Sequence, residues 1–226
     1  MVLLIHSDDL AFGYVNKSKT AHKVVEKVRK RFKIREQDGI DWVLGMGVQR
    51  DSNGGVILNQ SAFIHKILAG FDSHLKPADT PIDHTRKFSK SMSHEPTTSH
   101  DYKDFDYRHV IGNLSYLVLG TRPDLAFAYH LLSRFAQDPQ PAHIKAVTQV
   151  IRYLKKTKDF AMKFQGGAEL KLEMFVDADY GNDLDTRRSH TGWIAMLGGT
   201  PVSWKTTLQK QVSLSTTEAE IMAAVE

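Results

Sequence analysis

Two adjacent acids, Asp8 and Asp9, are the first residues of the chain whose types and spacing suggest chemistry. They follow the apolar run VLLI and precede a second short apolar run that stops at Gly13, a pattern typical of a β-hairpin with the acids at its bend. Neighbouring carboxylates repel one another, and a divalent cation shared with nucleic-acid phosphates offsets that repulsion. The pair is therefore a candidate metal site. The alternative is ordinary turn chemistry, in which Asp is common.

A second candidate group consists of Asp177, at the end of a predicted strand, and Glu220, inside the last predicted helix. Ser215 and Glu218 have the spacing of a capping box, which gives Glu218 a structural role at the start of that helix. Glu220 comes two residues after Glu218 and so lies roughly 200° around the helix from it. Glu220 is therefore free to face Asp177. Such a pair is half of a two-metal nuclease site, in which the ions activate a water and stabilise the leaving oxygen. The alternative for Glu220 is a solvated helical residue.

Other charged residues carry weaker predictions. Asp179 shares a face with Asp177 if the strand stays extended, but its place before Gly181 also suits a turn. Arg187 and Arg188 could clamp a phosphate or form a solvated pair. The chain has eleven histidines, and none has the helical spacing and partnering Glu of a zinc site, so we expect them at the surface. Those near the middle of the chain are His84, His94, His100 and His109.

The amino-acid composition excludes several classes of protein and several kinds of functional site. The chain has 226 residues, 41% hydrophobic and 25% charged, with no cysteine, which is ordinary globular composition and excludes disulfides, thiolate metal sites and cysteine nucleophiles. No apolar run approaches the roughly 18 residues that cross a bilayer, so we expect a soluble intracellular protein, cytoplasmic or nuclear, without a membrane partner. A net charge of +4 permits binding to a polyanion.

Hydropathy patterns predict an α+β fold. Residues 1–82 contain the first hairpin, a basic amphipathic helix that begins near Ser18, a second hairpin that turns at Asn53-Gly54, and a short helix at 61–71 capped by Ser61. Residues 83–106 are polar and poor in aliphatic side chains, so we expect a flexible connector. Three amphipathic helices follow within 107–165. Residues 166–226 predict strands at 170–176, 192–197, 201–205 and 212–214, and then the helix that carries Glu220.

Taken in order, these segments resemble the Pol polyprotein of copia-type LTR retrotransposons over nearly the whole chain. LLIHSDDLAFG is similar to the reverse transcriptase palm motif Y-x-D-D, and WVLGMGVQRD, ILNQSAFIHKIL and ADTPID are similar to the segments after it. YRHVIGNLSYLVLGTRPDLAFA and AVTQVIRYLKKT resemble the connection region. VDADYGND, RRSHTGW and SLSTTEAEIMAA resemble the start of a ribonuclease H domain.

The resemblance implies a domain order and two sets of site residues. Residues 1–82 would be part of the palm and a thumb-like region, 83–106 a connector, 107–165 the connection region and 166–226 the first part of a ribonuclease H-like mixed sheet. Asp8 and Asp9 match the paired polymerase carboxylates, and Asp177 and Glu220 match the first two ribonuclease H acids. The implied cofactor is Mg²⁺, with Mn²⁺ as a substitute. The implied partners are RNA template, DNA primer, dNTPs and RNA·DNA hybrid.

The chain also departs from the family pattern. His6 and Ser7 stand where the family has Tyr and an apolar residue. The third polymerase carboxylate belongs to an upstream motif and the remaining ribonuclease H acids to a downstream one, and the sequence contains neither motif. We therefore expect the chain alone to lack both activities. The alternatives are a catalytically dead nucleic-acid-binding module, which the basic helix favours, and a receiver-like phosphoacceptor domain, which the hairpins argue against.

Overall fold

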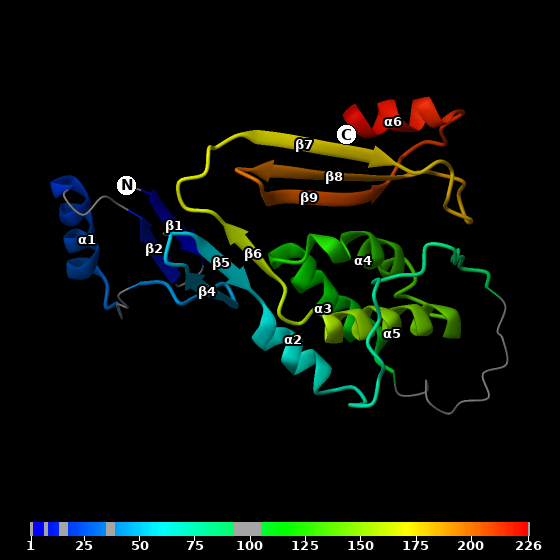
Figure 1. The fold of residues 1–226 in the computed structure, drawn as a ribbon, viewed down its shortest axis with the longest axis horizontal. Coiled ribbons are helices and arrows are strands. Elements are labelled where there is room, and N and C mark those ends of the chain that lie inside the picture. Colours follow the sequence, from blue (N-terminus) through cyan, green and yellow to red (C-terminus); the bar gives the residue numbers. More distant parts are fainter. Residues whose placement is uncertain (1, 7–8, 14–17, 35–38, 93–104, 226) are drawn as a thin grey trace. The chain divides into compact units, whose positions relative to one another are not determined.

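A computed structural model of the chain describes residues 2–6, 9–13, 18–34, 39–92 and 105–225. The chain forms two compact units, residues 1–40 and 41–226, and its helices and strands are drawn in Figure 1. Helices and antiparallel sheets occur together, so the predicted α+β class is confirmed. Beyond residue 41 the four-stranded sheet pairs strands of the early chain with residues 161–164, and the core contains residues on both sides of 82 and 106. The predicted domain borders at 82, 106 and 165 stay predictions.

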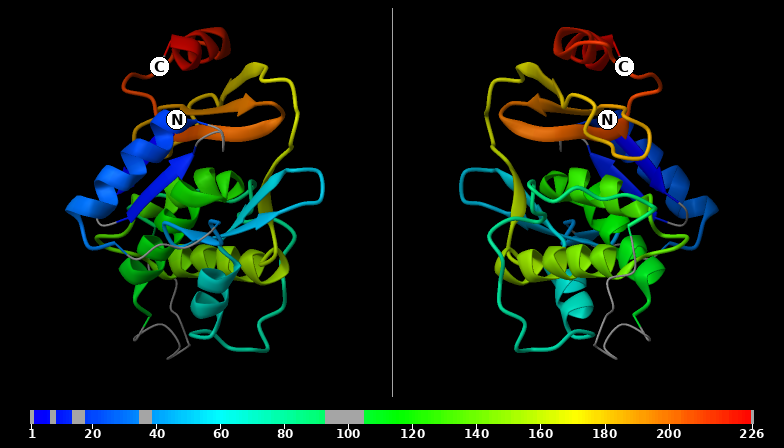
Figure 2. Two further views of the ribbon diagram at one scale, coloured as in Figure 1. Left: turned by 90° about the vertical axis from the view of Figure 1, so that its left-hand side faces the viewer. Right: turned by 90° about the vertical axis from the view of Figure 1, so that its right-hand side faces the viewer.

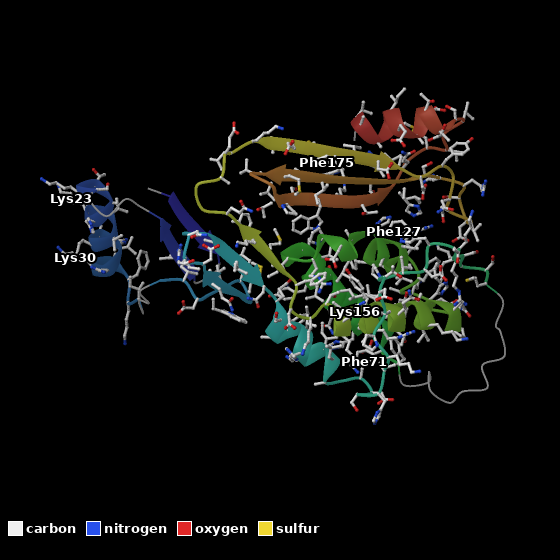
Figure 3. The ribbon with its side chains drawn as sticks, in the orientation of Figure 1. Lys23, Lys30, Phe71, Phe127, Lys156 and Phe175 are labelled. Carbon is white, nitrogen blue, oxygen red and sulfur yellow. The ribbon has the colours of Figure 1, made fainter. Side chains whose placement is uncertain are left out.

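The first unit contains the predicted hairpin and the predicted basic helix. Strand β1 (Val2–His6) pairs antiparallel with β2 (Asp9–Gly13), and His6 lies opposite Asp9. The predicted acid pair is located only through the backbone of Asp9, since Asp8 lies outside the described residues. Helix α1 (Lys19–Arg31) begins at Ser18, whose hydroxyl accepts a hydrogen bond from the Ala21 N–H. Lys23 and Lys30 both extend from this helix (Figure 3).

A four-stranded antiparallel sheet opens the second unit, in the order β3-β4-β5-β6. The strands are β3 (Trp42–Val43), β4 (Met46–Arg50), β5 (Val56–Asn59) and β6 (Ala161–Phe164). The predicted turn before β5 is present, with a φ of 77° at Gly54. A second turn joins β3 to β4, because Leu44 and Gly45 both have positive φ, as a two-residue hairpin loop requires. Strand β6 was not predicted, since four residues carry little periodicity.

The helical layer holds the hydrophobic core. It consists of α2 (Ser61–Leu68), α3 (Tyr107–Gly120), the 3₁₀ turn η2 (Pro123–Leu125), α4 (Ala126–Ser133) and α5 (Pro141–Lys156). Side chains with no exposed surface include Ile64, Leu114, Leu117, Leu125, Leu132, Val147, Val150 and Leu154. The apolar stripes that predicted three helices beyond residue 107 are therefore the faces that the helices bury against one another.

The predicted cap of α2 is wrong by one residue. Ser61 is the first helical residue and Gln60 takes the cap position, without a side-chain bond to the helix. The buried Gln60 amide instead donates to the Tyr116 carbonyl at 3.0 Å and accepts from the Thr121 N–H at 2.9 Å. Its side chain therefore satisfies backbone groups at the end of α3, a long-range role that local spacing does not reveal.

A three-stranded antiparallel sheet follows, in the order β7-β8-β9, with β7 (Leu172–Ala178), β8 (His190–Leu197) and β9 (Thr200–Leu208). It lies between α6 (Thr216–Val225) and the helical layer (Figures 1 and 2). The Trp204 indole N–H donates to the Val118 carbonyl at 2.8 Å and joins the sheet to α3. Strand β7 is at the sheet edge, and its Phe175 is more than half exposed (Figure 3).

The predicted strand at 212–214 is wrong. These residues belong to no strand, because their polar groups bond within the segment that leads into α6. The Ser213 hydroxyl donates to the Gln209 side chain, and the Leu214 N–H donates to the Glu218 carboxylate at 2.6 Å. The Glu218 N–H donates to the Ser215 hydroxyl at 3.1 Å. The predicted capping interaction is thus present, with the Glu218 carboxylate bonded one residue earlier than expected.

The first part of the predicted connector is packed rather than flexible. Ile82 and Phe88 are 2% and 4% exposed, and the Phe88 ring lies 5.9 Å from that of His143. Two apolar anchors at this spacing hold a segment that is otherwise polar. Residues 93–104 of the connector lie outside the described residues. Across the described ranges, no helix has both the length and the apolar character needed to cross a membrane.

Candidate functional site

A cleft of about 380 Å³ lies where one end of the β7–β9 sheet meets α4 and residues 82–88. Asp177, Gly192 and Thr206 line it from three neighbouring strands, and Phe127 and Leu131 line it from α4. Phe127 lies between this sheet and the helices (Figure 3). The opposite wall carries His84, Arg86 and Lys87. Carboxylate and cationic side chains therefore face one space from different elements.

Strand register directs Asp177 into this cleft. Asp177 lies opposite Gly192, which lies opposite Thr206, and residues in register share one face of a sheet. The neighbouring residue of β8, Thr191, has its side chain on the opposite face of the sheet. There the Thr191 hydroxyl accepts a hydrogen bond from the Gln209 side-chain amide. The same amide donates to the Ala219 carbonyl of α6. Asp177 is exposed, and within the described part of the chain no hydrogen bond or ion pair engages it.

Glu220 lies outside the cleft. It is an exposed residue of α6, which buries Ala219 and Ala223 against the sheet face opposite the cleft. Among the described residues, no hydrogen bond or ion pair links Glu220 to Asp177. Asp8 lies outside the described residues and Asp9 belongs to the other compact unit. Of the four predicted metal ligands, the structure therefore places Asp177 alone in the cleft, and a metal shared with Glu220 stays a prediction.

The Asp179 carboxylate is hydrogen-bonded to a neighbouring histidine, His190. One carboxylate oxygen accepts from the His190 N–H at 2.7 Å and the other lies 3.0 Å from the His190 Nδ1. Burial alone would raise the pKa of Asp179, but these hydrogen bonds lower it below its ordinary value. The Asp179 N–H also donates to the His190 carbonyl. Asp179 directly follows the end of β7 at Ala178 and lines the same cleft as Asp177.

Two further acids attach the β7–β8 loop to its surroundings. Asp183 is 3% exposed and forms a bidentate ion pair with Arg134, with both N–O distances at 2.9 Å. Burial would raise the pKa of Asp183, whereas the Arg134 guanidinium lowers it overall. Asp185 accepts from the Ser89 hydroxyl at 2.7 Å and from the Lys90 N–H at 3.1 Å. These bonds hold the loop against α4 and against the chain beyond Phe88.

The expectation that the histidines lie at the surface is wrong for two of them. His143 has no exposed surface, and its ring stacks on Phe135 with centroids 3.9 Å apart. His190 is 5% exposed and packs edge-on against Phe127. The sequence held a signal for His143, which shares the apolar stripe of α5, but none for His190, whose partner Asp179 is brought near by the β7–β8 turn.

His130 makes the stability of the fold sensitive to acid. It is half-buried on α4, and burial, followed by repulsion from His190, Arg134 and Lys205, lowers its pKa from 6.5 to about 4. Between these values the unfolded chain binds more protons, so the free energy of unfolding falls as the pH is lowered through this window. From pH 7 to pH 5 we expect His130 to remove up to about 2 kcal/mol.

Urea unfolding of His130→Gln at both pH values measures this contribution, with His65→Gln, at an exposed position of α2, as the matched control. We expect the loss between pH 7 and pH 5 to be smaller in His130→Gln than in the wild type and unchanged in His65→Gln. Equal losses in all three proteins would show that His130 does not contribute.

The donor set of the cleft suits one particular kind of metal binding. No three His, Asp or Glu residues of the described ranges form a group that could enclose an ion. Mg²⁺, however, usually keeps several waters and binds through one or two carboxylates together with substrate phosphates. A single unpaired carboxylate such as Asp177, opposite the cations Arg86 and Lys87, fits that arrangement. The cleft thus has one unpaired strand-end carboxylate and two cations around the same space.

Comparison with known proteins places the whole chain among transposon polyproteins. It is 35% identical, over its full length, to the retrovirus-related Pol polyprotein from transposon TNT 1-94 of Nicotiana tabacum, of which it spans 17%. It is 31% identical over 96% of its length to the corresponding polyprotein from transposon RE1 of Arabidopsis thaliana, of which it spans 14%. It is 28% identical over 99% of its length to the putative transposon Ty5-1 protein of Saccharomyces cerevisiae, of which it spans 71%.

No known family profile matches the chain. No solved structure matches it either. The similarity to the polyproteins is nevertheless continuous, because it runs through both compact units and includes the segments that form the cleft. It also agrees with the order of motifs along the chain. The chain therefore belongs to the retrovirus-related Pol polyproteins of copia-type transposons.

Proposed function

We propose that this chain supplies metal ligands for the phosphoryl-transfer chemistry of a retrotransposon Pol polyprotein. In this proposal Asp8 and Asp9 bind the Mg²⁺ ions of RNA-directed DNA synthesis, and Asp177 binds an ion of ribonuclease H hydrolysis. Glu220, which lies outside the cleft, is assigned to the same ligand set by the family resemblance alone. The observation that carries the proposal is the position of Asp177, an unpaired carboxylate in a cleft that Arg86 and Lys87 also line. The continuous similarity to Pol polyproteins supports the same assignment.

The residues of the cleft have distinct roles in this proposal. Asp177 binds and orients a divalent ion, and that ion supplies Lewis-acid stabilisation of charge on the phosphodiester. The Asp179–His190 and Arg134–Asp183 pairs hold the strand end and the loop in place. Asp179 and Asp183 already have internal partners, whereas the Asp177 carboxylate has none among the described residues.

Nucleic-acid binding and turnover test this proposal separately. The resemblance implies that this chain carries only part of the polymerase and ribonuclease H carboxylates. We therefore expect the chain to bind a labelled RNA·DNA hybrid in Mg²⁺, but neither to extend a primer nor to cleave the RNA. Binding should weaken steeply with KCl, since phosphate contacts release counterions. Turnover that disappears in Asp8→Asn or Glu220→Gln would disprove the expected inactivity. Absence of binding at low salt would disprove the nucleic-acid function.

A second candidate function is nucleic-acid binding without any role for a metal. It is favoured by α1, whose last turn carries Arg29, Lys30 and Arg31. Removal of Mg²⁺ separates the two functions. A metal-independent module would bind the hybrid equally well with EDTA and in an Asp177→Asn variant, whereas the first proposal expects both changes to weaken binding.

A further inference from the structure

We propose that residues 82–88 form a phosphate-binding wall, in which Arg86 and Lys87 hold the backbone of the nucleic-acid strand whose divalent ion Asp177 binds. This inference rests on the proposed function and extends it to a segment that sequence analysis treated as a flexible connector. The segment and Asp177 line the same cleft although they are far apart in the sequence.

The wall has a fixed conformation. Its two ends, Ile82 and Phe88, are buried, and the residues between them are exposed. Asp83 organises the turn, because its carboxylate accepts from the Thr85 N–H at 2.9 Å and its carbonyl accepts from the Arg86 N–H at 3.2 Å. A short segment held at both ends and bonded internally presents its cations with little conformational freedom, which lowers the entropy lost on binding.

The wall is also fixed relative to the strand that carries Asp177. Immediately after Phe88, Ser89 and the Lys90 N–H bond to Asp185 of the β7–β8 loop, and Arg134 holds Asp183 of the same loop. The loop begins just after the end of β7, where Asp177 lies. These bonds set the spacing between the cationic wall and the acidic strand end.

Four charged side chains of the cleft form no ion pair within the described residues: Asp83 and Asp177 are acidic, and Arg86 and Lys87 are basic. Asp179 and Asp183 are paired with His190 and Arg134. Within the described residues, no ion pair engages Arg86 or Lys87, although the Arg86 guanidinium lies 5.9 Å from the Phe88 ring. An arginine fork suits phosphate oxygens, and a divalent ion on Asp177 would remove its repulsion of the same phosphate. We therefore expect binding at the wall to strengthen when Mg²⁺ is present.

Fluorescence anisotropy of a labelled RNA·DNA hybrid, measured with the full chain across a KCl series, tests the wall. The test protein is Arg86→Gln/Lys87→Gln. The control is Lys66→Gln/Lys210→Gln, which removes two exposed cations that do not line the cleft. In Mg²⁺ we expect the wall variant to bind on the order of tenfold more weakly at 0.1 M KCl, with a salt slope lower by about two. The control should retain nearly wild-type binding.

The same experiment with Asp177→Asn and with EDTA distinguishes failure of this inference from failure of the proposed function. If the wall variant binds as the control does while Asp177→Asn and EDTA weaken binding, the wall is disproved and the proposed function stands. If the wall variant binds weakly but Asp177→Asn and EDTA have no effect, the wall stands and the metal-dependent function is disproved. If the wild type does not bind at low salt, both are disproved.

Discussion

Replacement of Asp183 with asparagine is expected to lower the free energy of unfolding by about 3–5 kcal/mol, the usual cost of removing one partner from a buried ion pair. The Asp183 side chain is 1% exposed and that of Arg134 is 16% exposed. The neutral amide would leave the Arg134 guanidinium desolvated without its counter-charge. It would also change the bond that Asp183 accepts from the Thr186 hydroxyl. The β7–β8 loop would then lose its attachment to α4.

Urea unfolding at pH 7 measures this loss. The matched control is Glu173→Gln, which removes the acid of the exposed Lys171–Glu173 pair and should cost about 0–1 kcal/mol. If the two variants lose the same stability, the Arg134–Asp183 pair does not hold the loop. Because Asp183 is neutralised in the native state and its pKa is lowered, its stabilising contribution should also diminish as the pH falls through that lowered pKa.

Replacement of Arg122 with methionine is expected to lower the free energy of unfolding by about 2–4 kcal/mol. Arg122 is 1% exposed in the helical layer. Its guanidinium donates to the Thr157 carbonyl at 3.1 Å and hydroxyl at 2.7 Å, and to Asp124 at 2.7 Å. Methionine fills part of the volume but leaves the acceptors at the end of α5 without their donor.

The control for this variant is Arg108→Met, at an exposed arginine that makes one hydrogen bond, to the Ala136 carbonyl. We expect that change to cost roughly 1 kcal/mol or less. Thermal or urea unfolding compares the two directly. Equal losses would mean that burial of the Arg122 network adds nothing to stability, contrary to the network that the structure describes.

Local periodicity predicted much of this fold. Apolar residues at helical spacing anticipated α1, α3, α4 and α5, and the Asn53-Gly54 turn anticipated the β4–β5 hairpin. The failures have a common cause, which is that long-range partners override local preference. Strand β6 exists because β5 offers it an edge. Phe88 is ordered because the core accepts its ring, although the segment around it is polar.

The candidate site was predicted only in part, for the same reason. The end of a strand followed by acids indicated Asp177, and the structure places it in a cleft. The cationic wall depends on contacts from Ser89 and Lys90 to Asp185, which no local pattern reveals. The buried role of His190 likewise depends on a turn that brings Asp179 to its ring. The sequence thus indicated Asp177 but not the surface opposite it.

Binding of Mn²⁺ to the chain in the presence of an RNA·DNA hybrid, followed by electron paramagnetic resonance, tests most directly whether Asp177 is a metal ligand at a nucleic-acid site. Asp159→Asn, at an exposed acid outside the cleft, is the control. We predict that the wild type and Asp159→Asn bind a Mn²⁺ ion in the presence of the hybrid, and that Asp177→Asn does not bind it. Equal Mn²⁺ binding by all three proteins would contradict the account.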